Sequence, residues 1–329
     1  MPVLNVADIQ IAVDSVRTTQ FALGIKDSTG AIYYAPASVG ACADSLKVKK
    51  DGVVYTIGKS SLYHTVTSLN TCETLELRPG CYTVEVMGGR GGDGGNNAGT
   101  GKNPESAVYT FSLDTYTTVY MLRGGDGASG SVNTSGSIAS GGGGGATGAP
   151  SIFVVNGVAT ISNGGEGGDG AKAKDSTGAT RDCGSGGKGS MTAGGNGAGS
   201  VGSDDWLSNG FVCGAGGGGA VGGTAGSASS GFLYNGLEGG AASSTGGGKG
   251  GDASMGGLFG SSSAPGGAGG ANVAYSCGGT TAYSYGGGGG GAVATGGLFG
   301  TGKGTNGGAG GSGAVNSSSV SYIKIYRFE

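Results

Sequence analysis

The residue types that most often carry chemistry are scarce in this sequence and do not combine into a recognisable site. The only histidine, His64, lies between Tyr63 and Thr65 in a run of β-forming residues, where a lone histidine is more often structural or exposed than a general base. Asp204 and Asp205 are adjacent, not spaced to converge on one substrate. No Ser/His/Asp or Cys/His set typical of nucleophilic catalysis is present. The sequence therefore predicts a protein that is not an enzyme and has no catalytic residue.

Motifs for cofactors and metals are equally weak. Gly-x-Gly-x-x-Gly patterns recur by composition alone, since 84 of the 329 residues are glycine, and no strand–turn–helix context supports them. The six cysteines contain no Cys-x-x-Cys pair, which is the usual spacing of a zinc site. Gly-Gly-x-Gly-Gly-Asp hexads begin at residues 88, 164 and 247, too far apart for a calcium β-roll, which needs tandem copies. We expect no cofactor and no metal.

Composition excludes several classes of protein. Glycine is far above its ordinary usage of about 7%, yet the 6 prolines are too few for collagen. No apolar run approaches the ~20 residues that a membrane span needs, and glycine disfavours helices. The net charge of −3 provides no broad basic surface for nucleic acid or anionic membranes. We expect no nucleic-acid partner and no membrane insertion, while a flexible Gly/Ser linker stays open on composition alone.

Glycine content divides the chain at Met87 and Gly88. Residues 1–87 hold six glycines, and the other 242 residues hold 78. The first part alternates β-forming runs with turn signals, which predicts strands at 21–25, 31–34, 46–48, 53–57, 74–77 and 81–87. We assign residues 1–71 to an N-terminal β domain for attachment or assembly, and residues 72–329 to a glycine-rich domain.

Further strands interrupt the glycine-rich part. Residues 106–113 and 116–123 are predicted to pair through Asp114-Thr115, and Asn156-Gly157 is a strong hairpin signal within 151–162. The closing segment 320–328 is expected to pair with 81–87. The predicted β platform therefore comprises residues 72–87, 106–123, 151–162 and 320–328.

The remaining glycine-rich sequence, residues 88–315, repeats its hexads and its glycine runs. Such self-similarity favours a built structure over a random linker. Glycine at two of every three positions suits an extended left-handed helix with three residues per turn, and bare helices can hydrogen-bond laterally. The predicted fold class is all-β with little or no α-helix: a small antiparallel β domain plus a polyglycine-II helix bundle closed by a C-terminal strand.

Aromatic and leucine side chains that interrupt the glycine are the candidate binding residues. Loops at the ends of rigid elements often carry recognition, and aromatic rings stack on sugars or fill pockets on a partner. The alternative is that these side chains plug the bundle ends or pack on the platform, which is favoured for the repeated Leu-Phe pairs at 258–259 and 298–299. The candidates for receptor binding are Trp206, Leu207, Phe211, Phe232, Tyr234, Tyr275, Tyr283 and Tyr285.

The order of these segments resembles a known pattern. A β segment over 72–87, a glycine burst, strands ending at Arg123, the hairpin near 151–162, long glycine runs and a closing strand over 322–325 are similar to the glycine-rich domain of bacteriophage tail fibre and receptor-binding proteins. More loosely, they resemble the glycine-rich domain of some animal receptor kinases. The resemblance covers about 72–329 and implies a polyglycine-II bundle with host recognition through loops at its tip.

The resemblance implies a non-enzymatic phage fibre or adhesin that recognises a bacterial surface glycan or outer protein. Residues 1–71 would then contact other virion proteins, and homo-oligomerisation stays open. We expect no cleaved secretory signal, because the N-terminus lacks a basic and an apolar region. The expected location is a virion assembled in host cytoplasm and exposed at the particle surface. The alternative is a purely structural virion or extracellular filament component.

Cytoplasmic assembly would keep the cysteines reduced at first. On that basis, Cys42, Cys72 and Cys81 are interpreted as small buried hydrophobes. Whether Cys183, Cys213 and Cys277 form bridges stays open.

Overall fold

A computed structural model describes residues 60–328, apart from 176, 182–183, 192–193, 200–209, 229, 232–233, 257–260 and 297–301, together with five strands before residue 60. The described chain is all-β with antiparallel sheets, as predicted, and its only helix is one 3-10 turn, η3 (Gly95–Asn97). The strands before residue 60 form a three-stranded sheet and a separate hairpin. Their bounds are β1 (Ile9–Ile11), β2 (Gln20–Lys26), β3 (Ile32–Ser38), β4 (Lys47–Lys50) and β5 (Val53–Thr56).

Two four-stranded sheets form one end of the glycine-rich domain, and we call them the platform. Their strand orders are β14-β13-β10-β7 and β6-β26-β8-β9. The sheet that contains β26 begins with β6, which lies inside the predicted N-terminal domain. The platform strands are β6 (Ser60–Thr65), β7 (Cys72–Leu77), β8 (Gly80–Met87), β9 (Ala107–Leu113), β10 (Thr117–Leu122), β13 (Ser151–Val155), β14 (Val158–Ser162) and β26 (Tyr322–Phe328).

The core of the platform lies between its two sheets. Alternate residues of β8 and β26, including Tyr82, Val84 and Ile323, are buried against Met121 of β10 and Phe153 of β13. This is the arrangement expected when the apolar faces of two sheets pack together. The predicted pairing of 320–328 with 81–87 is confirmed, because Tyr322 to Phe328 of β26 pairs with Met87 to Cys81 of β8.

One predicted strand pair is wrong. Residues 107–113 and 117–122 are both strands, but β9 pairs with β8 while β10 pairs with β7 and β13. The chain crosses from one sheet to the other at residues 114–116, so Leu113 and Val119 face the same core from opposite sheets. The strands on either side of Pro79 likewise lie in different sheets. A tight hairpin would have placed both strands of each pair in one sheet, whereas the crossing lets each contribute to one of the two sheets that pack together.

The hairpin at 151–162 is confirmed. β13 pairs with β14 through a turn in which Asn156 and Gly157 have φ of 49° and 77°, the positive values that a two-residue hairpin of this kind requires. The predicted hairpins of β2 with β3 and of β4 with β5 are confirmed as well.

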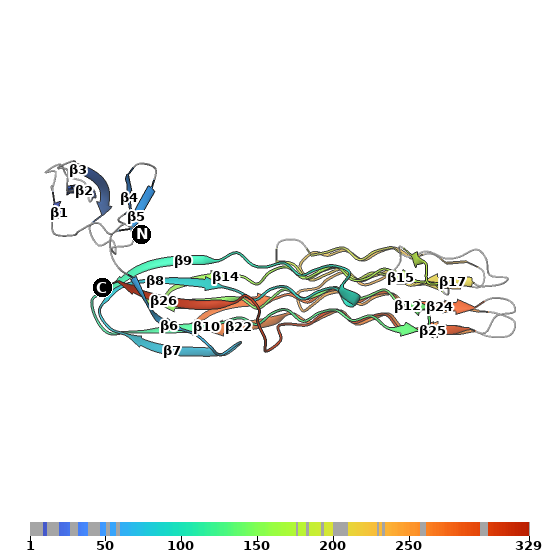
Figure 1. The fold of residues 1–329 in the computed structure, drawn as a ribbon. Helices are drawn as coiled ribbons and strands as arrows, with labels where there is room; N and C mark the ends of the chain where they lie inside the picture. Colours follow the sequence, from blue (N-terminus) through green and yellow to red (C-terminus); the bar gives the residue numbers. More distant parts are fainter. Residues whose placement is uncertain are drawn as a thin grey trace.

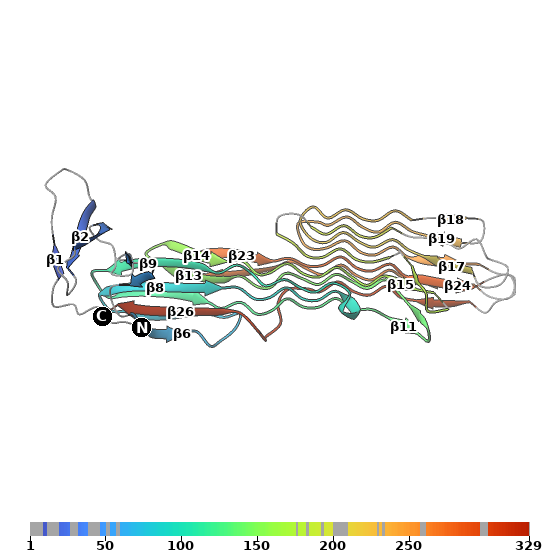
Figure 2. The ribbon, with the colours of Figure 1, turned by 45° about the horizontal axis from the view of Figure 1, so that its top comes forward.

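Extended glycine-rich segments run side by side from the platform to a second group of short sheets at the far end, which we call the distal sheets (Figures 1 and 2). A further hairpin, β22 (Val273–Cys277) and β23 (Thr280–Ser284), packs on the platform. The distal strands are β11 (Thr134–Ser135), β12 (Ile138–Ala139), β15 (Ala173–Lys174), β16 (Thr180–Arg181), β17 (Gly210–Cys213), β18 (Ser230–Gly231), β19 (Tyr234–Gly236), β20 (Ala253–Met255), β21 (Ser262–Ala264), β24 (Val293–Gly296) and β25 (Lys303–Thr305).

The hydrogen bonds of the buried segment 286–292 repeat every three residues. Its amides donate in turn to three different neighbouring segments; for example, Gly288 donates to Gly187 at 2.7 Å and Gly289 donates to Gly248 at 2.9 Å. Its carbonyls accept from three further segments. The segments that accept from it are 308–311, 184–187 and 248–251, and those that donate to it are 267–270, 141–144 and 214–220. The segment is therefore bonded to six neighbours.

Only glycine permits this spacing. A Cβ built on Gly288 or Gly289 would lie closer than 3.0 Å to the carbonyl oxygen of Gly217 or Gly267. Each lateral bond satisfies a buried backbone group that has no water available. These bonds and contacts replace the side-chain packing of an ordinary core.

The hexads place charged side chains at the same three-residue interval. Arg90 pairs with Asp93 at 2.6 Å, and Lys249 pairs with Asp252 at 2.8 Å. Each of these aspartates also accepts a backbone N–H from a neighbouring segment at 2.8 Å. The hexads that begin at residues 88 and 247 therefore combine bare backbone with an ion pair between the side chains of their third and sixth residues.

A disulfide joins Cys72 of β7 to Cys277 of β22, 205 residues apart in sequence. Cys213 is also disulfide-bonded, and Cys81 carries a free thiol. The interpretation of Cys72 as a small buried hydrophobe is wrong, because Cys72 is exposed on β7 and covalently bonded. Cys42 and Cys183 lie outside the described residues.

Candidate functional site

Two of the candidate aromatic residues are buried. Phe211 of β17 is 5% exposed and packs with Val293 in a small distal core. Tyr275 of β22 is 9% exposed, packs on the platform beside Leu122, and accepts a hydrogen bond from the amide of Ala314 at 3.1 Å. Burial raises the pKa of Tyr275. Neither ring presents a surface to a partner in this conformation, which fits the packing role that the sequence left open.

The other described candidates are more accessible. Tyr234 of β19 is half-buried and packs against a distal core that contains Met255. Tyr283 of β23 is 46% exposed, and its ring centroid lies 6.2 Å from that of Tyr285. Trp206, Leu207 and Phe232 lie outside the described residues, as do the Leu-Phe pairs at 258–259 and 298–299.

The candidates do not gather on one surface. Phe211 and Tyr234 belong to the distal sheets, whereas Tyr275, Tyr283 and the adjoining Tyr285 belong to the β22–β23 hairpin on the platform (Figures 1 and 2). The aromatic candidates that the structure describes therefore divide between the two ends of the glycine-rich segments. A distal surface and a platform surface can be tested separately.

A pocket that the sequence does not reveal lies beside the distal sheets. Its cavity volume is about 340 Å³, within the range of small-molecule sites. It lies between η3, the hairpin of β11 with β12, and β15. The residues that line it are Asn96, Val132, Thr134, Gly136, Ser137, Ala139, Ala171, Lys172, Lys174 and Gly178.

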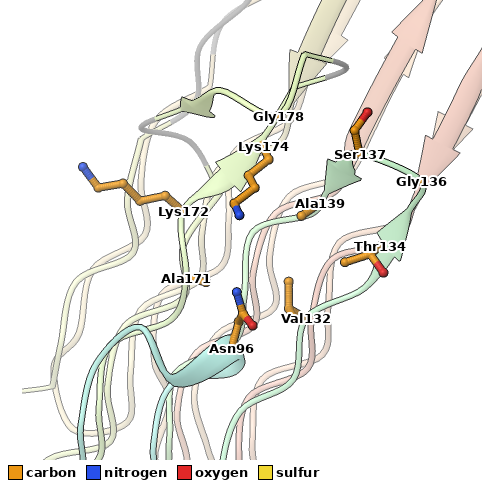
Figure 3. A pocket seen from close by; sticks show the side chains of 10 residues that line it. All are labelled: Asn96, Val132, Thr134, Gly136, Ser137, Ala139, Ala171, Lys172, Lys174 and Gly178. Carbon is orange, nitrogen blue, oxygen red and sulfur yellow. The ribbon is translucent and has the colours of Figure 1, made fainter.

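The pocket combines a cation with polar and apolar groups. Figure 3 shows the ammonium group of Lys174 and the amide of Asn96 turned toward one another, while Lys172 extends away. Ala139 and Ala171 contribute buried apolar surface. Among the described residues that line the pocket, none is acidic.

The turn beside the pocket is held by a buried aspartate. The Asp175 carboxylate accepts hydrogen bonds from the amide and hydroxyl of Thr177 at 2.9 and 2.6 Å, and pairs with Arg181 at 2.6 Å. Burial raises the pKa of Asp175, but the hydrogen bonds from Thr177 and Arg181 outweigh it, and the net pKa is lowered. Gly178 completes the turn with φ of 83°. Asp175 is thus ionised and bonded to Thr177 and Arg181. These bonds fix the turn that follows the strand carrying Lys174.

Glu166 forms the largest ion-pair cluster in the described residues, and its geometry opposes a catalytic role. Its carboxylate accepts from the ammonium groups of Lys102 and Lys188 at 2.8 and 3.2 Å, and from Ser190 Oγ at 3.1 Å. The hydrogen bond from Lys102 is the main cause that lowers the pKa of Glu166 to about 2, with burial opposing it. A general acid near neutral pH needs the opposite shift. This cluster links separate glycine-rich segments.

A second cavity of about 270 Å³ lies along β19, β20 and β21. Its acid, Asp252, is already paired with Lys249, so the cavity offers no unpaired charge to a ligand. The described ranges contain no group of three or more His, Cys, Asp or Glu side chains placed to hold a metal.

Comparisons with known proteins give no assignment. No protein-family model matches the chain, and no curated protein matches it significantly. Across the part of the chain that the structure describes, no helix is long and apolar enough to cross a membrane.

Proposed function

We propose that this protein is a non-enzymatic fibre or adhesin protein of a bacteriophage virion, in which a rigid polyglycine-II bundle presents a recognition surface to a bacterial receptor. The proposal joins the resemblance in sequence to the arrangement of the chain. Its two parts, the bundle and the recognition surface, have separate support.

The bundle is supported by backbone geometry. The three-residue repeat of hydrogen-bond directions over 286–292 matches a helix with three residues per turn. Gly94 has φ of −65° and ψ of 156°, close to the ordinary values for this helix. Six hydrogen-bonded neighbours are those of a hexagonally packed helix. The eight residues between β23 and β24 would then extend roughly 25 Å at ~3.1 Å per residue.

Recognition at the distal end is supported by the position of the N-terminal residues, which join the molecule at the end opposite the distal sheets. This observation carries the proposal. The first residue of the platform, Ser60 of β6, pairs with Phe328 at the outer end of the platform (Figure 1). The glycine-rich segments connect that end to the distal sheets (Figure 1). An attachment through the N-terminal residues therefore leaves the distal end free to meet another surface.

The test is adsorption of the labelled full chain to a panel of bacterial strains. We expect binding restricted to some strains and reduced about tenfold or more by Trp206→Ala, because tryptophan dominates many interfaces. Trp206 lies in residues 200–209, directly before β17. Tyr283→Ala is the matched control, since it removes an exposed aromatic ring at the platform end.

Other outcomes assign other roles. Loss of bacterial binding with Tyr283→Ala but not with Trp206→Ala would place recognition on the platform. It would contradict the proposal that the distal end binds the receptor. Binding to no strain, when the panel includes a host on which the particle grows, would favour a purely structural virion or extracellular filament component.

A further inference from the structure

We propose that the pocket between η3, the β11–β12 hairpin and β15 binds a saccharide that carries a carboxylate or phosphate group, with Lys174 as the ligand's counter-ion. The inference deepens the proposed function, because it names a ligand class for the distal half of the same molecule. It rests on that function only for its biological meaning, since the pocket can be tested alone.

The charge of the pocket selects an anion. The ammonium group of Lys174 is turned into the pocket toward Asn96 (Figure 3). The acid that directly follows Lys174 in the sequence, Asp175, is buried and engaged by Arg181 and Thr177. The Asp175 carboxylate is thus taken up by the hydrogen bonds and the ion pair of its own turn. A carboxylate or phosphate would accept a charge-assisted hydrogen bond from Lys174.

The size and surface of the pocket select a ligand larger than a bare anion. A volume of about 340 Å³ exceeds what one phosphate fills, and it suits a single sugar ring with its substituents. The amide of Asn96 supplies donors and an acceptor for hydroxyl groups. Val132, Ala139 and Ala171 offer apolar surface to the C–H face of a sugar ring.

The pocket is preformed, which lowers the entropy cost of binding. Lys174 lies on β15, which pairs with both β12 and β16. Asn96 has φ of 61°, a conformation that asparagine tolerates better than most residues. The site is thus built on fixed strands and turns.

The two lysines that line the pocket differ in direction. Lys172 and Lys174 flank Ala173, which is fully buried, so both lysines lie on the outer face of the chain. Of these two lining lysines, Lys174 is directed toward Asn96 and Lys172 extends away from it (Figure 3). A charge-removing change at Lys174 is therefore the most direct test.

The experiment titrates the full chain with glucuronate, glucose 6-phosphate, glucose and inorganic phosphate, followed by NMR. We expect at least one of the two acidic sugars to bind with a Kd of about 1 mM, as ligand efficiency allows for a small ligand. Glucose and inorganic phosphate should each bind about tenfold more weakly than that sugar. The tighter of the two acidic sugars assigns the carboxylate or the phosphate.

Lys174→Gln should weaken acidic-sugar binding about tenfold with an unchanged melting temperature. Lys324→Gln, which removes one lysine charge on β26 of the platform, should leave binding unchanged. The proposal is overturned if neither acidic sugar binds, if Lys174→Gln binds like the wild type, or if inorganic phosphate binds as tightly as the sugars. Sugar binding without adsorption to any strain would overturn the adhesin function and not the site. Adsorption to bacteria without sugar binding would overturn the saccharide site and not the adhesin function.

Discussion

Gly144 and Gly287 pack backbone against backbone: a Cβ on Gly287 would lie closer than 3.0 Å to the carbonyl oxygen of Gly144. That oxygen cannot move without breaking its own lateral hydrogen bond, the one it accepts from the amide of Gly311 at 2.9 Å. A single methyl group at this position therefore disturbs several segments together. The interior of this protein is more sensitive to added volume than a core of flexible side chains.

Gly287→Ala should destabilise the protein by more than about 3 kcal/mol, measured by urea unfolding, because the clash is with backbone on a buried segment. Gly199→Ala is the matched control. A Cβ on Gly199 would meet only Ser227, at 3.7 Å, and alanine there should change stability by less than about 1 kcal/mol. Equal effects of the two substitutions would contradict the packed-backbone interior.

Hydrogen exchange should separate this interior from a flexible glycine linker. The amide of Gly288 donates to Gly187 at 2.7 Å within a buried segment, so we expect protection of at least about 10³-fold, set by large-scale unfolding. Gly136, exposed in the turn between β11 and β12 with φ of 64°, should exchange much faster. Exchange of both amides within seconds, followed by NMR, would reject the lateral hydrogen bonds.

Local sequence signals predicted local structure well. The Asn156-Gly157 turn is found as expected because positive φ at two successive residues is encoded by those residue types. The same kind of reasoning failed at Asp114-Thr115. A short polar connection is compatible both with a hairpin and with a crossing between sheets. The choice depends on which sheet buries Leu113 and Val119, and that is a property of the whole platform.

The neighbours of each glycine segment were beyond prediction for a different reason. A glycine has no side chain that distinguishes one partner from another, so residues 286–292 carry no local record of their six neighbours. The pocket was missed because its residues come from three separated stretches, at residue 96, at 132–139 and at 171–178. The alternation of Lys172 and Lys174 before the Asp175 turn was the only local signal available.

The disulfide between Cys72 and Cys277 should contribute substantially to stability, because it closes a loop across 205 residues. The double substitution Cys72→Ser with Cys277→Ser should lower the free energy of unfolding by about 2–5 kcal/mol. Cys81→Ser, at the free thiol, is the control and should cost less than about 1 kcal/mol. Both are measured by urea unfolding without reductant, and a double variant as stable as the control would show that the bond adds nothing.

The ion pairs of Glu166 should make stability depend on acid pH. The hydrogen bond from Lys102 lowers the pKa of Glu166 from 4.5 to about 2. Because the pKa is lower in the folded state, this stabilisation is complete above pH 4.5 and is lost as the pH falls from 4.5 toward 2. Partial exposure limits it to roughly 1 kcal/mol. The melting temperature of Glu166→Gln should therefore lie below that of the wild type at pH 7 and approach it near pH 2, whereas Glu238→Gln, at an exposed acid, should follow the wild type throughout. A constant gap between Glu166→Gln and wild type across this range would assign the effect to packing instead of charge.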